Sequence, residues 1–409
     1  MEKFVSNTLS INSIHVPPSK SVAQRVLFGS ALSTQPLQIS NIGTCDDVLH
    51  IKEIIQQLGA QIIERQDTID VLGRKNKIQS TLDCGESGLG IRLTTTIAST
   101  FGQNFTILGS GSLLKRPLTQ FTDFLPQMGV SINEDGQLPL QVSGQLKGGE
   151  YTVDGSLSSQ YISGLLMALP LCQQDSILQV TSPTSLPYID ITLSILAFFG
   201  IKIVNDKYET YTIKGNQTYR PIRPETTIEG DWSSAAFWIV YGAINGKIKL
   251  KNLVKNSTQA DKAILDVITQ VGSKFEWEKE DLVVSKAELI PFEFNASNCP
   301  DLFPILVVLA ASINGTSIIT GVNRLKHKES DRGLVLQTEF KKLGLDIDIE
   351  GDKMTIYGTG HLNSGEIHSN NDHRIAMAGA IAATLTKKGV NITNAQSVNK
   401  SYPNFWESI

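Results

Sequence analysis

Cysteine is scarce in this sequence and never paired at short spacing. The 409 residues contain four, Cys45, Cys84, Cys172 and Cys299, and none belongs to a CxxC pair or to a Cys/His set with zinc-site spacing. We therefore expect reduced thiols and no bound metal. Long apolar runs are absent too: MEKFVSNTLS lacks a signal-peptide core, and LFPILVVLAA is shorter than the roughly 20 residues that span a bilayer. A cytoplasmic chain without a membrane partner is expected.

Positive charge is not in excess. Lys and Arg number 36 against 40 Asp and Glu, so the formal net charge is −4, whereas proteins that bind nucleic acid through bulk charge have a basic surface. Hydrophobic residues make up 41% of the chain and charged residues 19%, as in a globular protein. The length exceeds what one hydrophobic core usually supports, so we expect two domains. The negative net charge leads us to expect no nucleic-acid partner.

A short pattern recurs along the chain at a nearly constant interval. Each copy is a helix-like stretch, an apolar residue, a glycine and then alternating apolar residues, as in QQLGAQIIE, PQMGVSINE, AFFGIKIVN, TQVGSKFEW and KKLGLDIDI. The glycines follow one another at 70 to 72 residues: Gly59, Gly129, Gly200, Gly272 and Gly344. A glycine directly after a helix predicts a left-handed cap, and the alternation that follows predicts a strand.

Six apolar helical stretches alternate with these glycines. Each opens with a small polar cluster: PSKSVAQR, CGESGLG, GSLSSQY, GDWSSAAF, CPDLF and NDHRIAM. Ser or Asp in several of them predicts a helix N-cap, and a helix that is apolar on every side predicts burial on every side. Because solenoid repeats have only roughly 20–50 residues, we expect six larger α+β units, three in each of two domains.

Basic residues adjoin these predicted helix starts. The first turn of a helix has unpaired N–H groups and the positive end of the helix dipole, and it therefore attracts anions. In a chain of negative net charge, cations gathered at such positions indicate a focused anion site. Each cation taken singly is equally compatible with an ordinary solvated side chain. The residues concerned are Lys20, Arg25, Arg92, Arg116, Lys328, Arg332, Arg374 and Lys400.

Seven motifs, in order along the chain, resemble those of the 5-enolpyruvylshikimate-3-phosphate synthase family: PSKSVAQR, GSLSSQY, LPYIDITL, IEGDWSSAAF, HKESDR, NDHRIAM and NKSYPNF. The resemblance implies an α+β fold of two inside-out α/β barrels, built from six βαβαββ repeats with three in each domain. One domain would comprise residues 1–18 and 229–409 and the other residues 19–228. Pro17-Pro18 and the RPIRPE stretch suit stiff crossings between the domains. The active site is expected in the cleft between the domains.

The resemblance also implies a reaction. The enolpyruvyl group of phosphoenolpyruvate would be transferred to the 5-hydroxyl of shikimate 3-phosphate, with release of phosphate, in the shikimate pathway that leads to chorismate and the aromatic amino acids. No metal or organic cofactor is implied. The expected partners are the two substrates, with glyphosate as an inhibitor, and the chain is expected to act as a monomer.

Three residues are implied to be catalytic. Asp301 would be the base toward the 5-hydroxyl, Glu329 the proton donor to C3 of phosphoenolpyruvate, and Lys20 a cation that bridges both substrates. From the residues alone, Asp301 equally fits a helix cap and Glu329 fits a solvated charge. A carboxylate among cations tends to stay ionised, so Glu329 would have to be protonated transiently or by relay.

The remaining site residues are implied to bind the substrates. Arginine suits this task because its guanidinium pairs with carboxylate and phosphate in bidentate fashion. Shikimate 3-phosphate would be held by Lys20, Ser21, Arg25, Ser158, Ser159, Gln160, Ser185, Tyr188, Asp301 and Lys328. Phosphoenolpyruvate would be held by Lys20, Gly88, Arg116, Gln160, Lys328, Arg332, His373, Arg374 and Lys400. A core histidine is the competing interpretation of His373.

Some positions depart from the family pattern. Glu86 and Leu89 stand where the family usually has an amide and a threonine, beside the backbone of Gly88. We expect them to weaken anion binding and to reduce glyphosate sensitivity, unless a neighbour such as Arg92 neutralises Glu86. Leu114 replaces a frequent cation, and Arg324 stands where some members have asparagine.

Two other functions remain open. A UDP-N-acetylglucosamine enolpyruvyl transferase would share the fold, but it would carry Lys-Asn in place of Lys20-Ser21 and a cysteine near Arg116. A non-catalytic relative would merely bind shikimate or a partner. A phosphate-release assay with both substrates distinguishes these hypotheses.

Overall fold

The computed structural model describes residues 1–326 and 328–409. His327, within the HKESDR motif, lies outside the described residues. The chain divides into two compact units: unit 1 comprises Met1–Pro18 and Glu229–Ile409, and unit 2 comprises Ser19–Ile228. Within unit 1, the two segments that lead to unit 2 are hydrogen-bonded to each other, because Asp231 N donates to Pro17 O at 2.8 Å.

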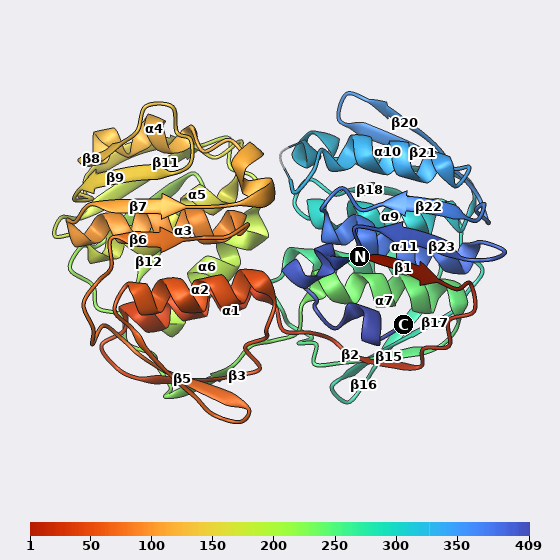
Figure 1. Cartoon of the computed structure of the whole chain (residues 1–409), viewed down its shortest axis with the longest axis horizontal. Coiled ribbons are helices and arrows are strands. Elements are labelled where there is room, and N and C mark those ends of the chain that lie inside the picture. Colours follow the sequence, from red (N-terminus) through yellow and green to blue (C-terminus); the bar gives the residue numbers. More distant parts are fainter. Residues whose placement is uncertain (327) are drawn as a thin grey trace. The chain divides into compact units, whose positions relative to one another are not determined.

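Unit 2 contains three four-stranded sheets of one topology (Figure 1). In each sheet the first two strands are parallel and the other neighbours antiparallel. In spatial order the strands are β14 (Glu225–Thr227), β3 (Leu37–Ser40), β5 (Thr68–Leu72) and β4 (Gln61–Glu64); β6 (Thr81–Asp83), β7 (Phe105–Leu108), β9 (Leu140–Gly144) and β8 (Val130–Ile132); and β10 (Glu150–Asp154), β11 (Ser176–Thr181), β13 (Thr210–Ile213) and β12 (Ile203–Asp206).

Unit 1 repeats this topology, with one truncation. Its third sheet ends with the parallel pair, and the N-terminal strand of the chain pairs antiparallel in place of the missing hairpin. In spatial order the strands are β2 (Ser13–His15), β15 (Ile248–Lys251), β17 (Asp281–Ser285) and β16 (Lys274–Glu278); β18 (Glu293–Asn295), β19 (Asn314–Thr320), β21 (Lys353–Thr359) and β20 (Asp346–Glu350); and β22 (Gly365–His368), β23 (Val390–Thr393) and β1 (Glu2–Val5).

Two kinds of helix alternate between the strands. The helices that follow the polar clusters are the most buried, and α3, α9 and α11 are buried along their whole length. The helices are α1 (Lys20–Leu32), α2 (Asp46–Gln57), α3 (Gly88–Ala98), α4 (Gln120–Phe124), α5 (Ser159–Ala168) and α6 (Leu186–Phe198) in unit 2, and α7 (Trp232–Asn245), α8 (Ile264–Gln270), α9 (Phe303–Ala311), α10 (Arg332–Lys342) and α11 (His373–Ala382) in unit 1.

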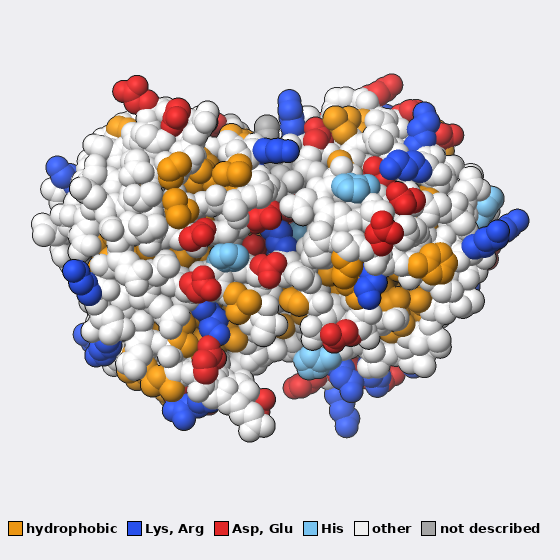
Figure 2. Space-filling view, in the orientation of Figure 1, with side chains coloured by type: hydrophobic (Ala, Val, Ile, Leu, Met, Phe, Trp, Pro, Cys, Tyr) orange, Lys and Arg blue, Asp and Glu red, His pale blue; other side chains and the backbone are white. Residues whose placement is uncertain are grey.

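The recurring glycines and polar clusters have the predicted conformations. All five glycines have φ between +75° and +94°, which is the left-handed region that favours glycine. The side chains of Ser87, Ser158, Asp231 and Asp372 cap α3, α5, α7 and α11. The predicted α+β class and its six repeats are confirmed, with buried helices inside each unit and sheets around them. On the face that Figure 2 draws, side chains of both charge signs are interspersed over each unit.

Among residues 1–326 and 328–409, no helix is both long and apolar enough to span a bilayer.

Candidate active site

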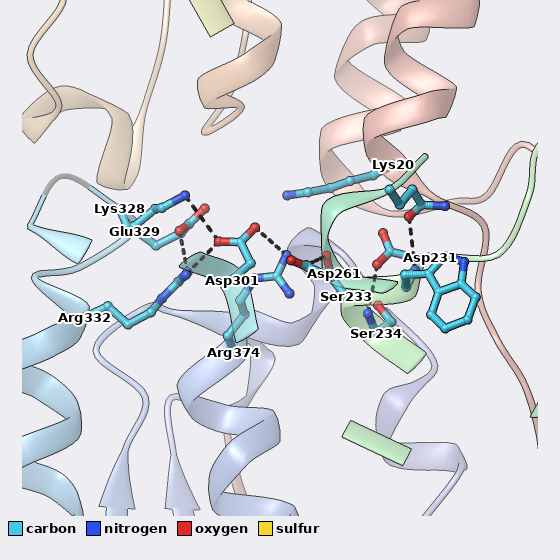
Figure 3. A network of polar contacts seen from close by, with 12 residues as sticks. Lys20, Asp231, Ser233, Ser234, Asp261, Asp301, Lys328, Glu329, Arg332 and Arg374 are labelled. Atoms are coloured by element: carbon cyan, nitrogen blue, oxygen red, sulfur yellow. Dashed lines mark hydrogen bonds and ion pairs between the residues drawn. The ribbon is translucent and has the colours of Figure 1, made fainter. Parts of the chain in front are cut away.

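In unit 1, Asp301 is surrounded by three cations. It lies in the short 3-10 helix η6 (Pro300–Leu302) before α9. Its Oδ1 accepts from Arg332 Nη1 at 2.9 Å and lies 3.3 Å from Lys328 Nζ, while its Oδ2 accepts from Arg374 Nη2 at 2.9 Å (Figure 3). Burial alone would raise the pKa of Asp301, but Arg374, Lys328 and Arg332 hold it well below its usual value. Asp301 is therefore an ion-pair centre rather than a helix cap.

Arg332 links Asp301 to two further carboxylates. Its fully buried guanidinium donates to Glu329 Oε2 at 2.7 Å and to Asp372 at 2.8 Å (Nε to Oδ2) and 3.2 Å (Nη2 to Oδ1). Burial lowers the pKa of Arg332, but Asp372, Glu329 and Asp301 outweigh this effect and raise it. Glu329 is thus fixed beside Asp301 by a shared cation, and it is not a solvated charge.

Asp372 is a site residue that the sequence prediction missed. It has no exposed surface, accepts from Arg374 N at 3.0 Å as the cap of α11, and also binds the Arg332 side chain. One carboxylate therefore fixes both the start of the helix that carries Arg374 and the orientation of Arg332. The signal was an aspartate before an apolar run, which indicates an N-cap but says nothing of its second partner.

A second buried carboxylate lies near Asp301. Asp261, in the 3-10 helix η5 (Ala260–Ala263), accepts from the Ser233 hydroxyl at the start of α7. Burial first, and then the negative charge of Asp301, raise the pKa of Asp261 to about 7, although Arg374 opposes the change. Nothing in the QADKAIL stretch marked this residue in the sequence.

The other predicted residues of unit 1 are buried or partly buried. Burial lowers the pKa of Lys328 against the opposing attraction of Asp301. His373 is the first residue of α11, next to Arg374, and is buried. Lys400 is buried at the end of the 3-10 helix η9 (Ala395–Lys400), which packs against α11. Arg324, in the 3-10 helix η7 (Val322–Leu325), precedes Lys328 by four residues.

In unit 2, three buried helices begin at one end. Gln24 in the first turns of α1 accepts from Ser87, the cap of α3, at 3.3 Å. Arg25 Nη2 donates to Ser163 in the first turns of α5 at 3.2 Å. The predicted residues at these starts are therefore neighbours, and they include both serines and cations.

Lys20 begins α1, and its ammonium has a carboxylate partner that was not predicted. Lys20 Nζ lies 2.7 Å from Asp47 Oδ2 in the first turn of α2. The lysine side chain is 14% exposed and that of Asp47 6% exposed, so the pair is largely shielded from water. The carboxylate holds the ammonium at the start of the helix.

Arg25 connects three helices. Its buried guanidinium donates to Thr192 Oγ1 at 2.8 Å and to the carbonyl oxygens of Ser21 and Tyr188 at 2.8 and 3.3 Å, besides Ser163. Burial lowers the pKa of Arg25 to about 10, so the group remains charged at neutral pH. Its hydrogen bonds link α1, α5 and α6, the helices whose starts carry the predicted shikimate 3-phosphate residues of unit 2.

The serines of the predicted shikimate 3-phosphate set lie at helix starts. Ser158 caps α5 by accepting from Gln160 N at 3.3 Å, and Ser159 is the first residue of that helix. Ser185 immediately precedes α6 in a left-handed conformation with φ of 53°, and Tyr188 is in the first turn. These positions offer hydroxyl groups beside helix N–H groups.

Gly88 and Arg116 are in close contact. A Cβ atom at Gly88 would lie 2.1 Å from Arg116 Nη1, so the guanidinium lies directly against the backbone at the start of α3. Arg92 Nη1 donates to Gly88 O at 2.8 Å.

Leu89 is buried at the second position of α3, whereas Leu114 is 62% exposed. The Glu86 carboxylate accepts from Ser112 N at 2.9 Å, so it is directed toward the segment that leads to Arg116.

Comparison with known proteins gives one family. Residues 9–409 match the EPSP synthase (3-phosphoshikimate 1-carboxyvinyltransferase) family. A 3-phosphoshikimate 1-carboxyvinyltransferase of Clostridium perfringens is 39% identical over 97% of this chain and 94% of its own length, and one of Clostridium acetobutylicum is 38% identical with the same coverage. An EPSP synthase structure from Acinetobacter baumannii is 25% identical, covers 100% of this chain and 97% of that one, and has a TM-score of 0.84. The enolpyruvyl transferase NikO of Streptomyces tendae, 17% identical with a TM-score of 0.77 over 100% of this chain and 95% of that one, shares the fold.

Proposed function

This chain belongs to the EPSP synthase family, and on that premise we propose that it transfers the enolpyruvyl group of phosphoenolpyruvate to the 5-hydroxyl of shikimate 3-phosphate. The oxygen of the hydroxyl bonds to C2 of phosphoenolpyruvate, its proton is removed, and C3 gains a proton. The resulting tetrahedral intermediate then loses phosphate and a C3 proton, which restores the double bond. This is the transferase step of the shikimate pathway toward the aromatic amino acids.

The observation that carries this proposal is the ionised Asp301 among Arg332, Arg374 and Lys328. Phosphoenolpyruvate is a multiply charged anion, and preformed cations at helix starts would stabilise the charge that develops on the intermediate. When the substrate anions engage these cations, their hold on Asp301 weakens and its pKa rises toward that of an effective base.

The residues divide by role. Asp301 accepts the proton of the 5-hydroxyl. Glu329, fixed by Arg332, is protonated transiently or by relay and then delivers that proton to C3. The cations of unit 1, with Lys20 and Arg116 of unit 2, bind phosphoenolpyruvate, and His373, Lys400, Gln160 and the backbone of Gly88 complete that subsite. Shikimate 3-phosphate is held by Ser21, Arg25, Ser158, Ser159, Ser185 and Tyr188, with Lys20, Gln160, Asp301 and Lys328.

Because shikimate 3-phosphate would be held mostly by residues of unit 2 and phosphoenolpyruvate by residues of both units, we also propose an active site in the cleft between the domains and closure on ligand binding. Small-angle scattering of the protein alone, and with shikimate 3-phosphate plus glyphosate, tests closure. A smaller radius of gyration is expected with the ligands, together with the mass of a monomer; an unchanged radius rules out closure.

A coupled phosphate-release assay tests the reaction itself. Phosphate release is expected with phosphoenolpyruvate and shikimate 3-phosphate together, and from neither alone. Release with UDP-N-acetylglucosamine in place of shikimate 3-phosphate would show the other enolpyruvyl transferase activity. Absence of release with either acceptor, from protein with intact secondary structure by circular dichroism, would show a non-catalytic relative.

A further inference from the structure

The segment that ends at Arg116 is attached at its start to the turn that precedes α3. Ser110 N donates to Gly85 O at 2.8 Å, and Ser112 N donates to Glu86 Oε2 at 2.9 Å. The 3-10 helix η2 (Gly111–Lys115) begins between these two bonds. Glu86 therefore acts on the chain 26 residues further on, beyond its own turn.

The fit of the Glu86 carboxyl group against this segment is close. Gly111 has φ of +52°, and a Cβ atom there would lie 2.2 Å from the Glu86 Cδ and Oε1 atoms. Both the conformation and the space at position 111 thus call for glycine. The carboxylate packs directly on the backbone, so it fixes both the position and the orientation of the start of η2.

The other end of the segment is attached as well. Pro117 O accepts from Arg92 Nη2 at 3.3 Å and from the Tyr161 hydroxyl at 3.0 Å. Arg92 also lies over the Tyr161 ring, with its Cζ 4.6 Å from the centroid, and binds Gly88 O. Arg116 lies between the two attachments, and its guanidinium lies against Gly88.

We propose that Glu86 is a positioning residue that places Arg116 for phosphoenolpyruvate by fixing the start of the 110–116 segment. The inference rests on the proposed function, because Arg116 is taken there to bind phosphoenolpyruvate. An ionised carboxylate is a strong hydrogen-bond acceptor. Here the Glu86 carboxylate helps to position Arg116 instead of repelling the anionic substrate. The expectation that Glu86 weakens anion binding is thereby replaced: its removal, not its presence, impairs the subsite.

The test is a set of variants assayed with each substrate varied in turn. Glu86→Ala removes the acceptor, Glu86→Gln keeps one carbonyl oxygen within reach of Ser112 N, and Glu64→Ala is the control. Glu64 is an exposed carboxylate of β4 in the same unit, with 61% of its side chain exposed. Hydrogen bonds to charged groups are worth roughly a tenfold change in an equilibrium constant.

We expect Glu86→Ala to raise the KM for phosphoenolpyruvate about tenfold, with the KM for shikimate 3-phosphate nearly unchanged. Glu86→Gln should recover most of the loss, and Glu64→Ala should match the unmodified protein. In an Arg116→Ala background, Glu86→Ala should add little, because both changes act through the same guanidinium. Circular dichroism and thermal unfolding identify variants that fail to fold.

Three results would overturn the positioning role: an unchanged KM for phosphoenolpyruvate in folded Glu86→Ala, equal loss in Glu86→Gln, or full additivity with Arg116→Ala. Failure of the proposed function is distinguishable, since the unmodified protein would then release no phosphate. In that case calorimetric titration with phosphoenolpyruvate itself tests the placement of Arg116. Weaker binding by Glu86→Ala, with Glu64→Ala unaffected, would support the role, and equal binding would overturn it.

Discussion

Asp301 and Arg374 join the starts of two buried helices, with Arg374 Nη2 2.9 Å from Asp301 Oδ2. Asp301 precedes α9 and Arg374 is the second residue of α11, so the ion pair spans two separate repeats of unit 1. Each helix start contributes unpaired N–H groups and a positive dipole end beside the cation. A carboxylate placed here remains ionised without substrate, and an anionic substrate would compete with it for the same cations.

Replacing the two carboxylates tests the assigned chemistry. Asp301→Asn and Glu329→Gln keep the size of each side chain but remove its capacity to exchange a proton. We expect kcat to fall by roughly 10²–10⁴, the usual contribution of one acid–base group, while the circular dichroism spectrum is retained. A folded variant with the kcat of the unmodified protein would exclude that residue from proton transfer.

Asp372 should be important for stability. Asp372→Ala removes one carboxylate partner of the buried Arg332 guanidinium, and it also removes the cap of α11. Removing one partner of a buried ion pair typically costs about 3–5 kcal/mol, and we expect a loss of about 3 kcal/mol in the free energy of unfolding by urea. Asp331→Ala is the control, since Asp331 caps α10 by accepting from Leu334 N, and within residues 1–326 and 328–409 it forms no ion pair with an arginine. That change should cost about 1 kcal/mol, and equal losses would contradict the burial argument.

The free energy of unfolding should also depend on pH through the protonation of the buried Asp261. Its pKa is raised to about 7 in the folded state, above the value of an unfolded aspartate. Between about pH 4 and pH 7 the folded state therefore binds this proton more tightly than the unfolded state, and its contribution to stability falls as pH rises. Burial is the largest cause of the raised pKa; Asp301 and Asp231 also raise it, and Arg374 lowers it.

Asp261→Asn removes this titration while keeping an oxygen that can accept from Ser233. Its stability relative to the unmodified protein should improve from pH 5 to pH 8, by more than about 1.4 kcal/mol, since that amount corresponds to a pKa difference of one. Urea unfolding of the full chain at both pH values measures the change. A constant difference between the two proteins would mean that Asp261 is not protonated in the folded state at pH 5.

The repeat and its helix starts were predictable because they depend on local rules. A glycine after a helix and a serine or aspartate before one act over a few residues, so Gly59 and Ser87 could be interpreted in isolation. The sequence also placed the cations Arg332 and Arg374 at helix starts. Their partners could not be found this way, because the contacts of Asp372 with Arg332 and of Asp47 with Lys20 join separate elements.

Glu86 is another residue whose contacts could not be predicted from the sequence. Its place before Gly88 suggested a negative charge near the anion site, with Arg92 as the neutralising neighbour. In the structure Glu86 bonds to the backbone of Ser112, and Arg92 donates to Gly88 O and Pro117 O. The direction of a side chain at a turn depends on which distant segment packs there, and sequence spacing does not contain that information.

Leu89 should set the response to glyphosate. We take the inhibitor to occupy the phosphoenolpyruvate subsite beside Gly88, where a leucine with 8% exposure fills the second position of α3. We expect its bulk to displace the helix start more than a threonine would, and a rigid inhibitor should tolerate that displacement less well than the substrate. Leu89→Thr should therefore lower the glyphosate Ki several-fold relative to the KM for phosphoenolpyruvate, because a displacement that costs about 1 kcal/mol changes binding about fivefold.

The matched control for this prediction is Leu49→Thr on α2, where the leucine is 39% exposed. It makes the same chemical change at an exposed side chain of another helix, so its ratio of Ki to KM should equal that of the unmodified protein. The ratio is more informative than either constant, because a general loss of anion binding would raise both together. If Leu89→Thr leaves the ratio unchanged, as Leu49→Thr should, the packing around Leu89 already compensates for its bulk, and the replacement of threonine by leucine does not affect glyphosate sensitivity.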